Sequence, residues 1–180
     1  MAAIFILSGS IIFPQSDEEV RKIYCDAGLG IGGIIYSENI YHKGIHPAGA
    51  FEASAGWALP RELQNLYIVA SFTFFGDADL GSKIDSNKLS YSTTMAIGAR
   101  LYPLSSKKEL QLGADIGYSR LWLRPGLPAN SGLGLKISAA YDFATNLTGR
   151  SMLLGTDIMI LTVQKNFAAG FTVFIKAVLK

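Results

Sequence analysis

The sequence predicts an all-β protein, an eight-stranded antiparallel up-and-down barrel whose strands cross a membrane. Three observations lead to this fold class. Apolar residues alternate with small or polar residues over most of the chain, turn residues separate eight such stretches, and the large apolar side chains share one face. No run of about 18 apolar residues occurs, so no membrane-spanning helix is expected.

The composition is apolar and poor in charge. Of the 180 residues, 49% are hydrophobic and 17% are charged, whereas soluble domains average about 25% charged residues. The formal net charge of +2 is too small to indicate nucleic acid as a partner. The single cysteine, Cys25, excludes an internal disulfide framework and a cysteine-based zinc cluster.

The N-terminal segment, residues 1–22, differs from the barrel expected over residues 23–180. Its apolar stretch from Ala2 to Phe13 has the length of a signal-peptide core, and we interpret it as the remnant of a signal peptide. A retained N-terminal strand or plug is the alternative. Ser16 followed by Glu19 forms a capping-box pattern, which predicts a short helical turn from Asp17 to Ile23.

The alternating stretches define the strands. Most are longer than soluble strands, which peak near 5–6 residues, and they suit tilted membrane strands, which need about 9–11. The segments are expected at residues 24–37, 49–60, 65–76, 88–102, 110–123, 132–144, 150–163 and 168–180.

The two faces of these strands decide where the barrel resides. One face carries Leu, Ile, Phe, Met and Trp, and the other carries mostly Gly, Ala, Ser and Thr. Small residues suit the crowded interior of a narrow barrel, and large apolar residues then point outward, which lipid tolerates. A soluble lipocalin-like barrel would instead carry many Lys, Glu and Thr on its exterior.

The connections and the aromatic residues fit the same orientation. With eight strands both termini lie on one side, which is the periplasm in bacterial barrels, and the outer loops are the longer ones. We expect outer connections at residues 38–48, 77–87, 124–131 and 164–167, of which the fourth is short and departs from this rule. Aromatic girdles are expected at the two membrane interfaces, with Trp57, Tyr67, Tyr141 and Phe143 on one side and Phe74 and Trp122 on the other.

The chain from residue 24 to residue 180 resembles the small eight-stranded outer-membrane barrels of the OmpA/OmpX type. The final strand, from Gly170 to Leu179, resembles the C-terminal signal that the barrel-assembly machinery reads. The resemblance implies a bacterial outer-membrane location, with outer-membrane lipids and lipopolysaccharide as surroundings and the barrel-assembly machinery as a partner during insertion. We expect no cofactor.

Two motifs suggest other chemistry and are rejected. Gly28, Gly30 and Gly33 match the dinucleotide pattern G-x-G-x-x-G, with Glu52 at a plausible distance, but no helix follows the glycines. We expect the glycines at 28, 30 and 32 to make room inside the barrel or to let the strand bend. His42 and His46 have a spacing that a helix could use for zinc, but Gly44 and Pro47 indicate a loop, and no third ligand is evident, so no metal site is expected.

A lipid-A-modifying function would need His46 together with Ser54. The His-x-Ser strand motif of barrel deacylases is absent, and no acid is placed to orient the histidine. We therefore expect no enzymatic activity.

Charged residues on the small-residue face are the most informative polar positions. Because unpaired burial of charge is costly, we expect them to pair inside the lumen. In a hairpin, two residues face each other when their numbers sum to twice the number at the turn centre, and we call this relation hairpin arithmetic. It predicts a row Lys136–Asp157–Lys176 with Asp157 at its centre and Asp26 close by. It also predicts a separate Arg100–Asp115 pair that is offset by about three residues. The predicted lumen residues are Asp26, Glu52, Arg100, Asp115, Lys136, Asp142, Asp157 and Lys176.

Taken together, these features predict a structural or anchoring outer-membrane barrel with a plugged polar lumen, whose outer loops form a binding surface. Three alternatives remain open. The lumen charges could line a narrow ion channel, the barrel could modify lipid A, or the protein could be a soluble lipocalin-like carrier.

Overall fold

The computed structural model describes residues 23–37, 45–59, 65–77, 90–103, 110–122, 129–143, 150–164 and 166–179, so the expectations for residues 1–22 lie outside the described residues. Ile23, expected as the last residue of the helical turn, is instead the first residue of a strand. None of the described residues form a helix long and apolar enough to cross a membrane. The strands are β1 (Ile23–Tyr36), β2 (Ile45–Ala58), β3 (Leu66–Asp77), β4 (Tyr91–Leu101), β5 (Leu110–Trp122), β6 (Asn130–Asp142), β7 (Arg150–Val163) and β8 (Asn166–Leu179).

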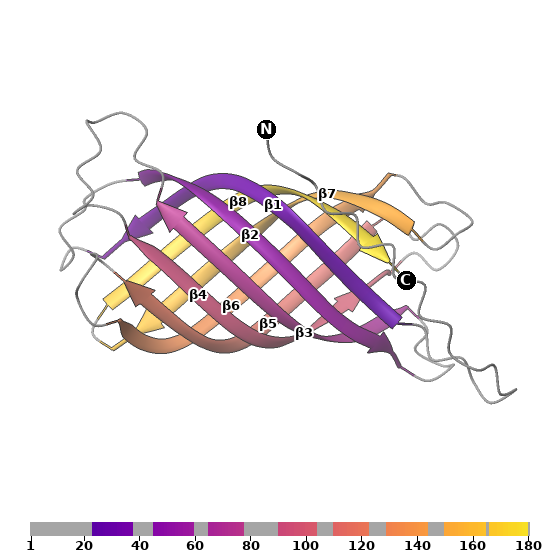
Figure 1. Ribbon diagram of the computed structural model, residues 1–180, viewed down its shortest axis with the longest axis horizontal. Coiled ribbons are helices and arrows are strands. Elements are labelled where there is room, and N and C mark those ends of the chain that lie inside the picture. The colour runs from indigo at the N-terminus through magenta and orange to yellow at the C-terminus, as the bar shows by residue number, and fades with distance from the viewer. Residues whose placement is uncertain are drawn as a thin grey trace, which may run out of the picture.

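The eight strands form one closed antiparallel barrel, which confirms the predicted fold class (Figure 1). Each strand pairs with its neighbours in sequence, and β1 pairs with β8 through a register that matches Leu29 with Ile175. Closure satisfies the backbone hydrogen bonds that an open sheet edge would leave unpaired. We call the end that carries Ile23 and Leu179 the terminal end and the end that carries Tyr36 and Ile45 the distal end.

Strand β2 is longer than the sequence predicts. It begins at Ile45, not at residue 49, so Pro47 lies within a strand and pairs with Gly33 of β1. The pairing of β2 with β3 begins only at Ala48, so the first residues of β2 have a partner strand on one side only. A proline is tolerated in such a local edge because its missing N–H breaks no ladder bond.

The connection between β7 and β8 is tighter than predicted. Val163 of β7 pairs directly with Asn166 of β8, which leaves two residues between the strands where a turn over 164–167 is expected. Gln164 has a φ of 50°, the left-handed backbone that two-residue hairpins favour. This shift moves the centre of the hairpin toward the N-terminus and changes which residues of the two strands face each other.

The outer surface of the barrel is apolar. Met95, Ile97 and Ile137 are each 68% exposed and point away from the lumen. Exposed large apolar side chains occur on all eight strands, including Leu29 on β1 and Val173 on β8. This outward row agrees with the faces assigned from the alternation.

The lumen is filled in three zones. A distal cluster is apolar, a terminal cluster combines tyrosines with aliphatic residues, and charged side chains occupy the middle. The distal cluster comprises Ile34, Tyr36, Ala48, Ala50, Phe75, Leu121, Met159, Leu161, Val163 and Ala168. The terminal cluster comprises Tyr24, Tyr67, Val69, Tyr102, Ala140, Leu153, Phe174 and Val178.

Candidate functional site: the charged centre of the lumen

All eight charged residues assigned to the small-residue face are buried inside the barrel. Arg100 and Asp142 are each 1% exposed, and none of the eight exceeds 6%. Alternation along the strands directs these side chains inward. The eight are Asp26, Glu52, Arg100, Asp115, Lys136, Asp142, Asp157 and Lys176.

Glu52 lies at the centre of the largest group of ion pairs. Its Oε2 accepts hydrogen bonds from Lys136 Nζ at 2.9 Å and from Lys176 Nζ. Lys136 also donates to Thr73 Oγ1 at 3.1 Å. Lys136 belongs to β6 and Glu52 to β2, four strands apart in a ring of eight, so this ion pair crosses the barrel from wall to wall. Such a contact fixes opposite walls relative to each other.

A glycine makes the second contact of Glu52 possible. Gly28 of β1 pairs with Glu52 on one side and with Lys176 on the other. A Cβ at position 28 would lie 2.5 Å from Lys176 Cγ and 2.1 Å from the Ile175 carbonyl oxygen. Because Gly28 has no side chain, Lys176 and Glu52 can contact each other across β1 on the lumen side. This agrees with the expectation that this glycine makes room in the lumen.

Arg100 and Asp115 form the second group. The guanidinium contacts both carboxylate oxygens of Asp115, with Nη2 to Oδ2 at 3.0 Å, so the pair is bidentate. The offset is two residues, because Asp115 pairs in register with Gly98 and Arg100 with Gly113. Charge-assisted bidentate contacts are among the strongest hydrogen bonds in proteins.

Lys136 joins the two groups into one network. Asp115 faces Lys136 directly across the β5–β6 pair, and Asp115 Oδ2 lies 3.2 Å from Lys136 Nζ. Ser71 Oγ donates to the same carboxylate at 3.2 Å. The predicted connection at 124–131 would place Asp115 opposite residue 140, whereas the observed register places it opposite Lys136.

Tyrosines complete the network toward the terminal end. Tyr24 donates to Asp26 Oδ2 at 2.6 Å, and Arg100 Nε lies 3.9 Å from the same oxygen. Gln111 Nε2 donates to the hydroxyl oxygens of Tyr24 and Tyr102, at 2.9 and 2.8 Å. These hydrogen bonds connect the charged centre to the terminal cluster.

The predicted row Lys136–Asp157–Lys176 is wrong. Asp157 pairs in register with Ser138 and Thr172, and it accepts a hydrogen bond from Thr172 Oγ1 at 2.6 Å. No lysine nitrogen of the described residues lies within ion-pair distance of it. The tight β7–β8 turn shifts the register by about three residues, and Glu52 takes the central role assigned to Asp157.

Two further lumen residues, Asp26 and Asp142, lie toward the terminal end. Asp26 lies beside Arg100 and Tyr24, not beside the lysine row. Asp142 lies at the end of β6 toward the terminal end, where it faces Leu153 of β7.

The histidine motifs do not assemble into a site. His42 lies outside the described residues. His46 lies within β2, not in a loop, and its ring contacts the ring of Tyr36 at a centroid distance of 5.9 Å. Ser54 is eight residues farther along the same strand, roughly 26 Å away at the usual rise per residue, so the two side chains cannot act together. Within the described ranges no group of three or more possible metal ligands occurs.

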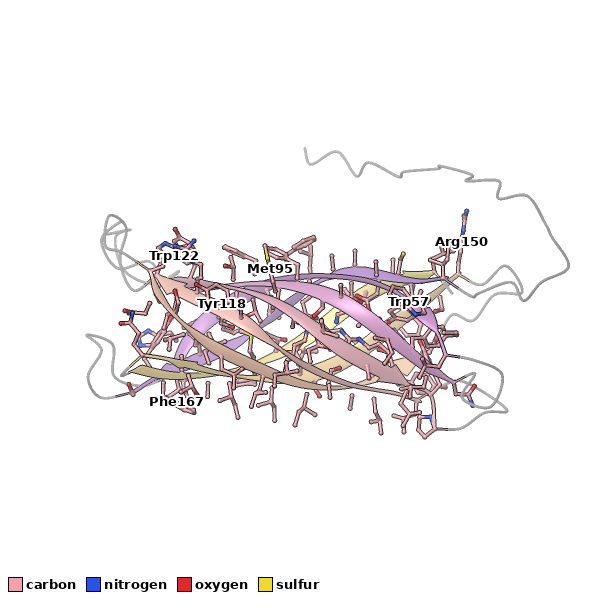
Figure 2. All side chains as sticks on the ribbon, turned by 90° about the horizontal axis from the view of Figure 1, so that it is seen from below. Trp57, Met95, Tyr118, Trp122, Arg150 and Phe167 are labelled. Carbon is pink, nitrogen blue, oxygen red and sulfur yellow. The ribbon has the colours of Figure 1, made fainter. Side chains whose placement is uncertain are left out.

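Aromatic side chains mark both rims of the outer surface. Figure 2 shows Trp122 and Phe167 near the distal end and Trp57 and Arg150 near the terminal end. Trp57, Tyr141 and Phe143 are about half exposed, at 54%, 52% and 49%. Tyr67 is the exception to the predicted girdle, because its side chain is fully buried in the lumen.

The charged centre lies between the distal and the terminal cluster. Every cation of the lumen contacts at least one carboxylate, and apolar or tyrosine-rich packing covers the charged centre on both sides. Buried charges of this kind are tolerated when they are paired and hydrogen-bonded.

Comparison with solved structures identifies the architecture. The crystal structure of Neisserial surface protein A (NspA) matches with a TM-score of 0.68 and 14% sequence identity, over 88% of this chain and 96% of that chain. The crystal structure of Ail, the attachment invasion locus protein of Yersinia pestis, matches with a TM-score of 0.55 and 8% identity, over 88% of this chain and 99% of that chain.

The fold is that of the small eight-stranded outer-membrane barrels. No protein-family model matches the sequence, and no curated protein does either. At these identities the likeness concerns the small-barrel fold alone.

Proposed function

We propose that this protein is a structural or anchoring barrel of the bacterial outer membrane, with a lumen closed by ion pairs and with distal loops that form a binding surface. The observation that carries the proposal is the inverted polarity of the barrel. Ile97 is 68% exposed, whereas Arg100, three residues later on the same strand, is 1% exposed. Hydrocarbon surroundings make an apolar exterior and a polar interior favourable.

The orientation follows from the strand count. The terminal end faces the periplasm and the distal end faces the exterior, as in bacterial barrels with an even number of strands. The longest connection, residues 78–90, lies at the distal end, which supports this assignment. Outer-membrane lipids and lipopolysaccharide then surround the strands, and the barrel-assembly machinery acts on the chain during insertion.

The lumen serves rigidity and not transport. An ion moving through the barrel would have to separate Glu52 from two lysines and pass the apolar distal cluster. We infer that the closed state is the stable one and that the barrel has no catalytic activity on lipid A. The distance between His46 and Ser54 along β2 supports the second inference.

Reconstitution tests the proposal. The purified chain is refolded into liposomes, floated on a density gradient and fused with a planar bilayer. We expect the protein to float with the vesicles and to give no steady conductance. Regular conductance steps would favour the channel. A monodisperse preparation without detergent would favour the soluble carrier, and an altered acylation pattern of lipid A in an expressing host would favour the enzyme.

A further inference from the structure

An arginine lies among aromatic rings on the outer surface near the distal end. We define the β3–β5 aromatic row as Phe74, Tyr91 and Trp122. The rings of Phe74 and Tyr91 stack at a centroid distance of 6.0 Å, and those of Tyr91 and Trp122 stack at 4.8 Å. The guanidinium carbon of Arg120 lies 5.1 Å from the centroid of the Trp122 ring.

The Trp122 end of the aromatic row lies near the depth of the lipid headgroups. Ile116 is the middle residue of β5 and pairs with Ile97 of β4. Trp122 is six residues farther along the strand, about 20 Å at the usual rise per residue. With a strand tilt of about 35–45° this corresponds to roughly 15 Å along the membrane normal, near the edge of the apolar band. Trp and Tyr are enriched at this depth.

Arg120 has no anionic partner in the described part of the chain. Its side chain is exposed, and its register neighbours are Thr93 of β4 and Ser131 of β6, which carry no charge. All ion pairs among the described residues lie inside the lumen. Arg120 is two residues nearer the middle of β5 than Trp122. A cation at this depth is costly unless its side chain extends to water or to an anion at the membrane interface.

The geometry leaves the guanidinium ready for a phosphate. The cation–π contact with the Trp122 ring favours a position of the guanidinium over that ring. Its N–H groups point along its edges, in the fork that matches phosphate bidentately. Below it, toward the middle of the barrel, Tyr118 and Met95 are 55% and 68% exposed and pair with each other. This apolar surface can accommodate an acyl chain attached to the same headgroup.

We propose that Arg120 and the β3–β5 aromatic row bind a phosphate group of lipopolysaccharide in the outer leaflet. The proposal rests on the proposed location and orientation, because the distal end then lies in the leaflet that contains this lipid. Charge complementarity favours a phosphate headgroup with net negative charge over a zwitterionic or neutral headgroup.

The test measures lipid binding in neutral detergent micelles. Trp57→Phe leaves Trp122 as the single tryptophan, since the chain has two, and its fluorescence reports on the site. The probes are bisphosphorylated lipid A, dephosphorylated lipid A and phosphatidylglycerol. Arg120→Gln removes the charge, and Arg150→Gln is the matched control, because Arg150 is an exposed arginine at the opposite rim.

We expect Arg120→Gln to weaken the binding of bisphosphorylated lipid A by about tenfold or more, the usual loss for a charge-assisted contact. Arg150→Gln leaves the affinity unchanged, and both other probes bind more weakly than bisphosphorylated lipid A. Equal losses in the two variants, or equal binding of the dephosphorylated lipid, would overturn the site. Phosphatidylglycerol binding as tight as that of lipid A would overturn the assignment to lipopolysaccharide.

The binding assay separates this inference from the proposed function. Binding in micelles does not depend on membrane location or on orientation. A protein that floats with liposomes but fails to bind lipid A refutes the inference alone. A protein that binds lipid A through Arg120 but never floats with liposomes refutes the proposed function alone.

Discussion

Replacement of Glu52 by Gln is the change that most directly disturbs the interior. The Glu52 carboxylate accepts hydrogen bonds from Lys136 and Lys176. Without it, Lys136 keeps Asp115 at 3.2 Å, whereas Lys176 has no other carboxylate within ion-pair distance among the described residues. Glu52→Gln therefore leaves one buried ammonium group without an acidic partner.

The expected cost follows from that loss. Removal of one partner from a dry buried pair costs about 3–5 kcal/mol. Glutamine keeps a carbonyl oxygen that can accept one hydrogen bond, so we expect a loss of about 3 kcal/mol in the free energy of unfolding. Removing the stranded cation as well, in Glu52→Gln/Lys176→Met, should restore part of the stability, with a coupling energy of about 1–3 kcal/mol.

Urea unfolding in detergent micelles or liposomes measures the effect, followed by tryptophan fluorescence and by gel mobility without boiling. Asp157→Asn is the matched control, because Asp157 is the carboxyl group next to Glu52 and accepts a hydrogen bond from Thr172, but it forms no ion pair with a lysine among the described residues. An amide oxygen retains that bond, so the control should change the stability by less than about 1 kcal/mol.

Two results would refute this reasoning. A loss below about 1 kcal/mol for Glu52→Gln would mean that water enters the lumen and solvates the lysines. An equal or larger loss for Asp157→Asn would mean that Asp157, and not Glu52, is the residue on which the lysines depend.

Two further pairs of substitutions, each a test and its control, probe the outer face and the packing of the lumen. Ile97→Arg, at the middle of β4, should destabilise the inserted barrel by roughly 2–4 kcal/mol, and Ile45→Arg, at the start of β2, by roughly 0–1; equal costs in a folding titration would contradict the membrane depth assigned to these positions. Gly98→Ala places a Cβ 2.6 Å from the Ala114 carbonyl oxygen and against Asp115, and should cost about 1–3 kcal/mol. Gly49→Ala meets no atom within 4 Å and should be neutral in the same measurement, so a comparable loss there would show that chain flexibility, not space, decides the effect.

The sequence was sufficient for the fold and for the direction of the lumen side chains. A period of two separates the faces of each strand, so a residue such as Lys176 is assigned to the interior without knowledge of its partners. The ends of the strands were harder to predict where a residue typical of turns lies inside a strand. Pro47 reads as a loop residue, yet it lies in a strand, because the first residues of β2 lack a neighbour on one side.

The partners of the charged residues could not be predicted in the same way. Hairpin arithmetic relates adjacent strands only, and it fails when a turn centre is misplaced, as for Asp157. The Lys136–Glu52 pair crosses the lumen between residues 84 positions apart, so no local pattern contains it. The one sequence signal is Gly28, a lumen position without a side chain, and the structure shows that Glu52 and Lys176 both pair in register with it.

The clusters of large side chains at the two ends of the lumen were also not predicted from the sequence. Phe75 and Leu153 lie on the inward face, and each is at most 2% exposed. Their size conflicts with the expectation that the inward face carries mainly small residues. Near the ends of the barrel the large side chains fill the lumen above and below the charged centre.

Membrane fractionation tests the central claim most directly. The full chain is expressed in a bacterial host, inner and outer membranes are separated on a sucrose gradient, and each fraction is run on a gel with and without boiling. We predict that the protein occurs in the outer-membrane fraction and migrates differently before and after boiling, as a closed barrel inserted in lipid does. Recovery of the folded protein from the soluble fraction without detergent would contradict the claim.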